Sequence, residues 1–272
     1  MMPMTINSGR IEKTFAALKE RGEKALIAFT TAGDPDMKTT VALVHTLEAS
    51  GADIIELGIP FSDPMADGPT IQASSERALK NGVTIKDVFG AVAEIRKDSA
   101  IPIVLFGYYN PVFVFGVKRF AREAKRAGCD GVLIVDLPAE EAGDLKKELD
   151  ARGLDLIFLL TPTSDASRIR LISGMASGFL YFISVTGVTG ARAALSANIP
   201  AFVKKIKKAS PLPVAVGFGI SSPEQARAAS HLSDGVIVGS ALINKIAGKK
   251  RGKLLDDAGR FIASLKSGMT GR

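Results

Sequence analysis

Short apolar runs alternate with amphipathic stretches eight times along the 272-residue chain. Each apolar run is continuous and is bounded by glycine, proline or polar residues, a pattern typical of a strand buried on both faces. The predicted strands are residues 25–30, 53–58, 102–106, 131–135, 156–160, 179–184, 214–217 and 235–238.

The intervening stretches repeat apolar residues at three- and four-residue spacing, which predicts helices that bury one face. The clearest are residues 39–49, 86–96, 117–127 and 140–152. Ser222 to Gln225 forms a predicted capping box with Pro223 at the first helical position. A Ser8-led helix, residues 8–22, precedes the first strand.

Strands that alternate with helices imply a parallel sheet, and eight such units favour a closed (β/α)₈ TIM barrel. A doubly wound open sheet is the alternative, but no Gly-x-Gly-x-x-Gly motif follows the first strand. We expect one α/β domain over residues 1–272, divided into an N-terminal helix (8–22), a barrel (24–248) and a basic C-terminal helix and tail (249–272).

Two long connections, residues 60–84 after strand 2 and 184–200 after strand 6, are expected to serve the active site. Glu56 interrupts an apolar strand, and Asp67 follows in a proline-stiffened loop. A buried carboxylate is costly, so the two side chains are candidates for an acid–base pair on one bound molecule. The alternative is that Glu56 pairs with a buried cation and Asp67 caps a turn.

Glycines end the last two predicted strands, in Gly217–Ser221 and in Val238–Ser240. Backbone N–H groups can approach an anion closely there, and a helix that starts near Ser240 would direct its positive end at the same place. Loops 7 and 8 of barrels often bind phosphate, although each glycine alone could simply make a turn. Tyr181 lies in strand 6, just before a Gly- and hydroxyl-rich segment with the composition of a lid.

The amino-acid composition excludes some classes of function. The net charge of +7 is concentrated near the C-terminus, and three Tyr and no Trp argue against nucleic-acid binding. The single cysteine, Cys129, is expected to be a buried spectator in a cytoplasmic protein, since no secretory signal is evident.

Both histidines fall in predicted helices and no lysine lies in a predicted strand. We therefore expect metal-free, cofactor-free acid–base chemistry on a phosphorylated small molecule. Asp136, after strand 4, is either a third site carboxylate or a helix cap.

Residues 56–72 (ELGIPFSDPMADGPTIQ) closely resemble the signature of the tryptophan synthase alpha subunit family. The similarity extends to residues 29–35, 109–111, 136–138, 184–190 and 217–221. It implies a lyase that cleaves indole-3-glycerol phosphate to indole and glyceraldehyde 3-phosphate, the retro-aldol step of tryptophan biosynthesis. It also implies a pyridoxal-phosphate-bearing beta subunit in an α2β2 tetramer, and no cofactor or metal in this chain.

The resemblance implies a role for each matching residue. Glu56 would be the acid–base group, Asp67 would stabilise positive charge at the indole nitrogen, and Tyr181 would lie near the reacting centre. The remaining matches are Gly190, Gly219, Gly239 and Ser240 for the phosphate, Phe29, Leu133, Leu159 and Phe218 for the indole pocket, and Gly187 and Thr189 for the lid. The beta-subunit interface would lie near Asp63, Pro64 and residues 109–115. Phe113 and Phe115, expected in a loop there, are either interface anchors or residues that pack on the barrel rim.

These roles require a raised pKa for Glu56 and a more solvated or hydrogen-bonded Asp67 that stays charged. Val185, where many relatives carry a basic residue, and the basic tail depart from the family pattern. A lyase active without a partner, a barrel isomerase of a phosphorylated aromatic amine and a non-enzymatic scaffold for the beta subunit remain alternatives.

Overall fold

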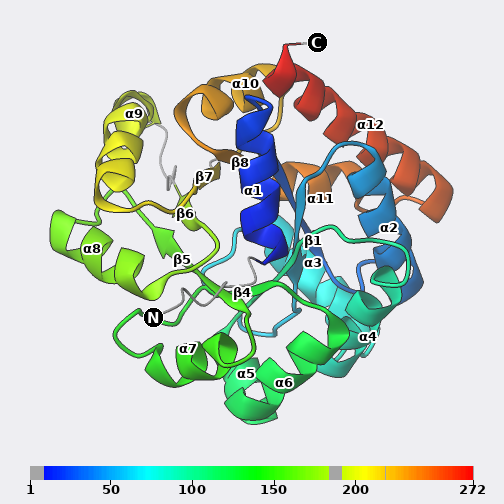
Figure 1. Cartoon of the computed structure of the whole chain (residues 1–272). Helices are drawn as coiled ribbons and strands as arrows, with labels where there is room; N and C mark the ends of the chain where they lie inside the picture. Colours follow the sequence, from blue (N-terminus) through cyan, green and yellow to red (C-terminus); the bar gives the residue numbers. More distant parts are fainter. Residues whose placement is uncertain (1–8, 184–191, 218, 272) are drawn as a thin grey trace.

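A computed structural model describes residues 9–183, 192–217 and 219–271. Eight parallel strands close into a barrel in sequence order, with β8 paired to β1 (Figure 1). The strands are β1 (Ala25–Thr31), β2 (Ile54–Gly58), β3 (Ile103–Gly107), β4 (Gly131–Ile134), β5 (Asp155–Leu160), β6 (Leu180–Ile183), β7 (Val214–Gly217) and β8 (Gly235–Val238). The predicted (β/α)₈ barrel is confirmed.

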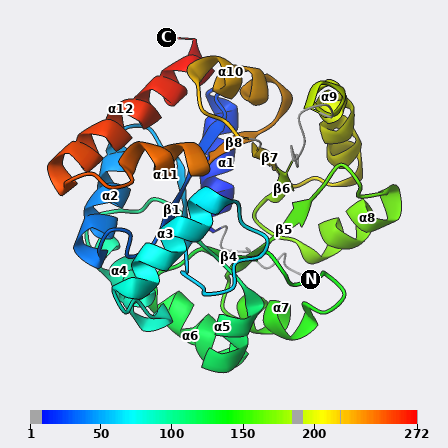
Figure 2. The same ribbon diagram turned by 180° about the vertical axis from the view of Figure 1, so that it is seen from behind.

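Helices surround the barrel, as Figure 2 shows from the opposite end. They are α1 (Arg10–Glu20), α2 (Met37–Ala49), α3 (Pro69–Lys80), α4 (Ile85–Ile95), α5 (Tyr109–Phe115), α6 (Val117–Ala127), α7 (Gly143–Asp150), α8 (Ala166–Met175), α9 (Arg192–Ala209), α10 (Pro223–Leu232), α11 (Ser240–Ile246) and α12 (Arg251–Thr270). None of the helices in the described ranges is long and apolar enough to cross a membrane.

Helix α1 covers the N-terminal end of the barrel (Figure 1). Its buried residues Ile11, Phe15 and Leu18 recur at helical spacing and join the cluster that fills the barrel interior. The Phe15 and Phe179 rings lie 5.8 Å apart, centroid to centroid. This end is therefore filled with packed apolar side chains, and the opposite end is left for chemistry.

Three helices lie where the sequence predicted connections or loops. Helix α3 lies inside the predicted 60–84 connection, and α9 begins before Pro200 and continues through it. Phe113 and Phe115, predicted in a loop, lie on α5. Pro111 is tolerated there because backbone N–H groups of a first helical turn have no intrahelical acceptor.

The predicted capping box at α10 is only half formed. The Ser222 side chain accepts a hydrogen bond from the Gln225 N–H at 3.4 Å. The Gln225 side-chain oxygen accepts from the N–H of Ser221 at 2.8 Å, not from that of Ser222. The reciprocal bond therefore reaches one residue further back than predicted.

Candidate active site

Glu56 lies in the middle of β2, in register with Phe29 of β1 and Val104 of β3. Its side chain is 1% exposed, and its Oε1 atom has no hydrogen-bond partner. Burial alone raises the pKa of Glu56 from 4.5 to about 8. No cation of residues 9–183, 192–217 or 219–271 forms an ion pair with it, so the alternative of a paired structural carboxylate is wrong within those ranges. The direction of this shift agrees with the predicted rise in pKa.

Asp67 is the more hydrogen-bonded of the two carboxylates. Its Oδ2 accepts a hydrogen bond from the Tyr108 hydroxyl at 3.1 Å, and its backbone N–H donates to Pro64 O at 2.9 Å. The Gln72 side chain donates to Asp67 O at 2.8 Å. Partial burial raises the pKa of Asp67 to about 6, although the Tyr108 hydrogen bond acts to lower it. Asp67 is therefore mostly ionised at pH 7, when Glu56 is mostly protonated.

The charges of both carboxylates act on Tyr181 of β6. It is 9% exposed, and burial, followed by the negative charges of Glu56 and Asp67, raises its pKa well above the usual value. Its ring lies directly against Gly217 of β7, where a Cβ atom would stand 2.6 Å from the phenol oxygen. Glycine at position 217 therefore leaves the space that the Tyr181 side chain occupies.

The predicted indole-pocket residues that the structure describes are Phe29, Leu133 and Leu159. Leu133 and Leu159 belong to, or pack against, the interior cluster that contains Tyr181. Phe29 meets Phe106 edge to face at 5.1 Å, and a Cβ at Gly58 would stand 2.8 Å from the Phe29 ring. Apolar rings thus line the C-terminal end of the barrel beside Glu56.

Two of the predicted phosphate glycines lie at the same end. Gly219 has a φ of +64°, which favours glycine, and apart from its chain neighbours no described residue has an atom within 4 Å of a Cβ built there. Gly239 precedes Ser240, the first residue of α11, and a Cβ at Gly239 would stand 3.6 Å from Phe29 Cβ. The predicted residues Gly187, Thr189, Gly190 and Phe218 lie outside the described residues.

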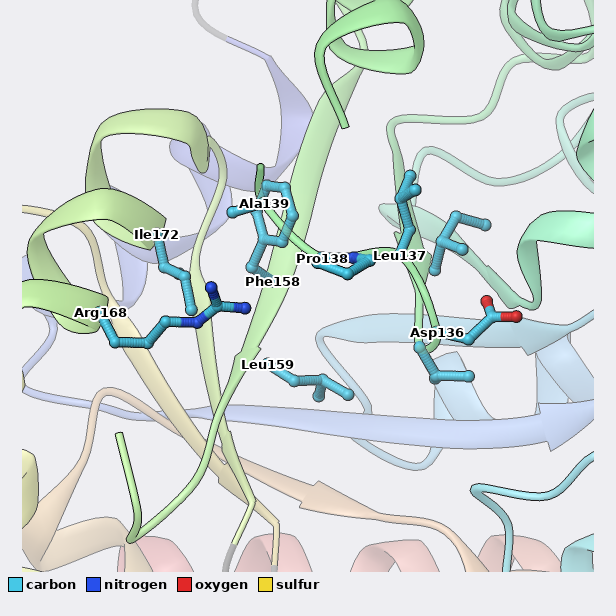
Figure 3. A pocket seen from close by; sticks show the side chains of 10 residues that line it. Asp136, Leu137, Pro138, Ala139, Phe158, Leu159, Arg168 and Ile172 are labelled. Atoms are coloured by element: carbon cyan, nitrogen blue, oxygen red, sulfur yellow. The ribbon is translucent and has the colours of Figure 1, made fainter. Parts of the chain in front are cut away.

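A cavity of about 220 Å³ lies beside this site, between the β4 and β5 ends and α8 (Figure 3). Leu159 lines it, and Arg168 extends toward Pro138 and Phe158 while the Asp136 carboxylate turns away. Asp136 Oδ1 accepts from the N–H of Tyr109, the first residue of α5, at 2.8 Å. Of the two alternatives for Asp136, the helix cap is confirmed, and the helix that it caps comes from the preceding βα unit.

The described residues give no support to catalysis by a histidine, a Schiff-base lysine or a bound metal. His45 lies in α2 and His231 in α10, and the strands contain no lysine. Within the described part of the chain, no three His, Cys, Asp or Glu side chains cluster as metal ligands would. The arrangement can therefore exchange protons through a neutral carboxyl and stabilise a cation through an ionised one.

Comparisons with known proteins identify the family of this chain. A family model described as tryptophan synthase alpha chain matches residues 15–266. The tryptophan synthase alpha chain of Geobacter sp. (strain M21) is 54% identical over 260 residues, which cover 96% of this chain and 97% of that protein. The chain belongs to the tryptophan synthase alpha chain family. Its activity is the lyase reaction of that family, the cleavage of indole-3-glycerol phosphate in tryptophan biosynthesis.

Solved tryptophan synthase structures share the fold. The alpha subunit from Legionella pneumophila str. Paris superposes with a TM-score of 0.87 at 40% identity, covering 97% of this chain and 100% of that one. A chain of tryptophan synthase from M. tuberculosis, in its open form with BRD0059 bound, gives a TM-score of 0.86 at 35% identity, covering 96% and 99%.

The sequence patterns do not single out Tyr108, which the structure places in contact with Asp67 of the candidate site. It follows β3 directly and contacts Asp67 through its hydroxyl. The available signal was its position, because polar residues at the C-terminal ends of barrel strands face the site.

Proposed function

We propose that Glu56 is the acid–base catalyst of indole-3-glycerol phosphate cleavage. The observation that supports this most is a fully buried carboxyl with an unpartnered Oε1 atom and a pKa of about 8, in the middle of an apolar strand. Such a group holds a proton at neutral pH, as a general acid must. Burying it without a partner costs folding free energy that no structural bond of Oε1 recovers.

In the proposed reaction, the Glu56 carboxyl first donates its proton to C3 of the indole ring. The ring then carries a positive charge at its nitrogen. Glu56, now a carboxylate, takes the proton from the hydroxyl on the side-chain carbon bonded to C3. The electrons of that O–H bond form the aldehyde carbonyl, the C3–carbon bond breaks, and its electron pair restores the neutral indole. Glu56 ends protonated, as it began.

Asp67 and Tyr181 serve the charged intermediate in this proposal. An ionised Asp67, whose pKa is about 6, offsets the positive charge at the ring nitrogen. Tyr181 stays a neutral phenol, since burial and the charges of Glu56 and Asp67 raise its pKa well above the usual value.

Binding of the substrate is assigned to the surrounding apolar rings and glycines. We assign the indole ring to a pocket of Phe29, Leu133, Leu159 and Phe218, and the phosphate to Gly190, Gly219, Gly239 and Ser240. Gly187 and Thr189 are assigned to the lid. The buried ring of Phe29 and the positive φ of Gly219 support this assignment.

The chemistry needs no metal or cofactor in this chain, because proton transfers alone break the bond. We propose a tryptophan synthase beta subunit that carries pyridoxal phosphate as the partner, in an α2β2 tetramer. The buried, unpaired Cys129 fits the reducing cytoplasm.

The partner surface is proposed near Asp63, Pro64 and Tyr109–Phe115. Large apolar side chains are exposed there: Met65 is 87% exposed, Phe113 65% and Val114 78%. Exposed large apolar side chains are typical of a protein interface.

The test of the proposed function is release of indole from indole-3-glycerol phosphate, with and without the beta subunit. We expect slow release alone, strong activation by the partner, and a loss of about 10³-fold in Glu56→Gln. Full activity without a partner would assign the chain to the stand-alone lyases. Unchanged activity in Glu56→Gln would contradict the proposed role of Glu56.

The partner surface has its own test. Phe113→Ser should weaken binding of the beta subunit by about tenfold or more in calorimetry, because an exposed aromatic anchor is lost. Leu171→Ser, at an apolar residue 41% exposed on α8, is the matched control. Equal affinities for the two variants would move the interface elsewhere.

A further inference from the structure

Tyr108 lies at the junction of the barrel wall and the loop that carries Asp67. It follows the last residue of β3 and is the N-cap residue of α5, so regular structure fixes its backbone on both sides. Its side chain is 3% exposed and its ring packs against Phe61, with 5.2 Å between centroids. The Tyr108 hydroxyl therefore has a well-defined position.

The Tyr108 hydroxyl makes two hydrogen bonds to adjacent residues of that loop. It accepts from the N–H of Ala66 at 3.0 Å and donates to Asp67 Oδ2 at 3.1 Å. The first bond orients the hydroxyl proton toward the carboxylate, because it occupies a lone pair of the phenol oxygen. One side chain thus holds both the backbone and the carboxylate of the loop.

No other long-range side chain in the described ranges holds residues 60–67 by a hydrogen bond. The remaining bonds of this segment are local, such as Asp67 N–H to Pro64 O and the Gln72 side chain to Asp67 O. Half of the segment is exposed, namely Ser62, Asp63, Met65 and Ala66, and Met65 is 87% exposed. Among the described residues, only Tyr108 donates a hydrogen bond to the Asp67 carboxylate, and the local bonds hold only the Asp67 backbone.

We propose that Tyr108 is a positioning residue for Asp67, which fixes the carboxylate at the place where the indole nitrogen becomes positive. This inference rests on the role proposed above for Asp67. Charge stabilisation depends on a preorganised group, and a displacement of about 1 Å can cost on the order of 10²-fold in rate. Tyr108 does not touch the reacting atoms, and it acts through the carboxylate.

The pKa of Asp67 depends on the hydrogen bond from Tyr108, so a titration of Asp67 measures the effect of that bond. Burial and the charge of Asp67 raise the pKa of Tyr108, so the phenol keeps its proton and remains a donor. The bond in turn stabilises the ionised Asp67. The other titratable groups involved are Tyr181, which is subject to the charges of Glu56 and Asp67, and Asp136, whose charge acts on Tyr108. None of these groups is altered in a Tyr108→Phe variant.

Tyr108→Phe keeps the ring and deletes both hydrogen bonds. We expect kcat to fall by about 10- to 100-fold with KM changed less, because stabilisation of the charged intermediate is lost. The acidic limb of the pH–rate profile, assigned to Asp67, should move upward by about one pH unit. NMR titration of the ¹³C-labelled Asp67 carboxyl, without substrate, should show the same displacement.

Ser177→Ala is the matched control. The Ser177 hydroxyl also accepts a hydrogen bond from a backbone N–H, that of Leu156 at 2.9 Å, and it also acts to lower the pKa of a carboxyl, Asp155, at the opposite end of the barrel. It should lower thermal stability about as much as Tyr108→Phe and leave the acidic limb in place. Site-specific 3-fluorotyrosine at position 108, a stronger donor of the same shape, should shift the Asp67 titration downward.

An Asp67 titration that is the same in the wild type, Tyr108→Phe and the fluorotyrosine variant would overturn the proposal. A shift in the titration without a loss of kcat would likewise contradict a positioning role. If the wild type released no indole, the proposed function would fail, while the substrate-free titration would still decide whether Tyr108 controls Asp67.

Discussion

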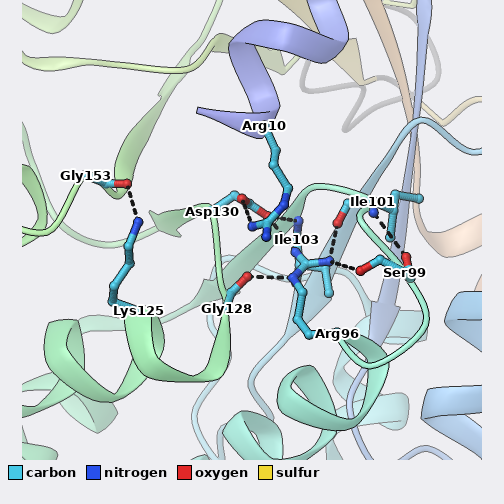
Figure 4. Close-up of polar contacts among 9 residues, drawn as sticks. All are labelled: Arg10, Arg96, Ser99, Ile101, Ile103, Lys125, Gly128, Asp130 and Gly153. Carbon is cyan, nitrogen blue, oxygen red and sulfur yellow. Dashed lines mark hydrogen bonds and ion pairs between the residues drawn. The ribbon is translucent and has the colours of Figure 1, made fainter. Parts of the chain in front are cut away.

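Each end of the barrel buries a carboxylate, and the two carboxylates have opposite surroundings. At the N-terminal end, Asp130 accepts hydrogen bonds from Arg10 at 2.9 Å, Arg96 at 2.6 Å and the Ile103 N–H at 2.9 Å (Figure 4). At the other end, Glu56 is buried and its Oε1 has no partner. A carboxylate that holds a structure together is satisfied by donors, whereas one that must exchange protons is left without them.

The Arg96 side chain, which pairs with Asp130 at the N-terminal end, makes further hydrogen bonds of its own. Besides Asp130, its guanidinium donates to Gly128 O at 2.7 Å and Ile101 O at 2.6 Å. Burial lowers the pKa of Arg96, and the Asp130 charge opposes that effect. This network ties the loop before β3 to the loop before β4, so its loss should be felt as unfolding.

The largest expected effect separates the two carboxylates. Glu56→Gln should reduce indole release by about 10³-fold and keep the fold, whereas Asp130→Asn should cost about 3–5 kcal/mol of unfolding free energy because Arg96 loses its counter-charge. Urea unfolding and indole release, measured on both variants, check this. Two variants that lose activity and stability in the same proportion would contradict the distinction.

A second effect depends on pH. The pKa of Glu56 is 4.5 in an unfolded chain and about 8 when folded, so the folded state favours the protonated form. The wild type should therefore lose stability relative to Glu56→Gln as the pH rises from 4.5 through 8, by on the order of a few kcal/mol. The difference in unfolding free energy between wild type and variant should change by that amount between pH 5 and pH 9. A constant difference would mean that Glu56 is ordinarily solvated.

The smallest effect compares two crowded glycines. Gly217→Ala puts a Cβ 2.6 Å from the Tyr181 hydroxyl, and Gly131→Ala, at the other end, puts one 2.8 Å from the Ile157 side chain. Both should lose about 1–3 kcal/mol of stability by overpacking. Only Gly217→Ala should also reduce kcat/KM, by about tenfold, since it displaces Tyr181. Equal kcat/KM values in the two variants would dissociate Tyr181 from the reaction.

The sequence predicts the barrel well because its strands are continuous apolar runs with clear ends. It misses α3 because that helix buries Ser74, Ser75 and Ala78, so its inward face has no apolar period. It misses α5 and the first half of α9 because Pro111 and Pro200 indicate a break that tertiary packing overrides.

Some residues of the candidate site can be predicted from the sequence and others cannot. Glu56 is conspicuous because an apolar strand gains nothing from a carboxylate by packing alone, and its raised pKa follows from burial alone. Tyr108 is not conspicuous, since tyrosine occurs commonly at the ends of apolar strands. Its importance arises from a hydrogen bond to a residue 41 positions away in the chain, which only the folded barrel brings within reach.

The most direct test of the proposed mechanism is a titration of the Glu56 carboxyl itself. Carbon-13 NMR of protein labelled at glutamate Cδ, with the Glu56→Gln variant used to assign the signal, gives its pKa without substrate or partner. We expect a pKa of about 8. A value near 4.5, that of the unperturbed group, would contradict the role of Glu56 as a proton-holding acid at neutral pH.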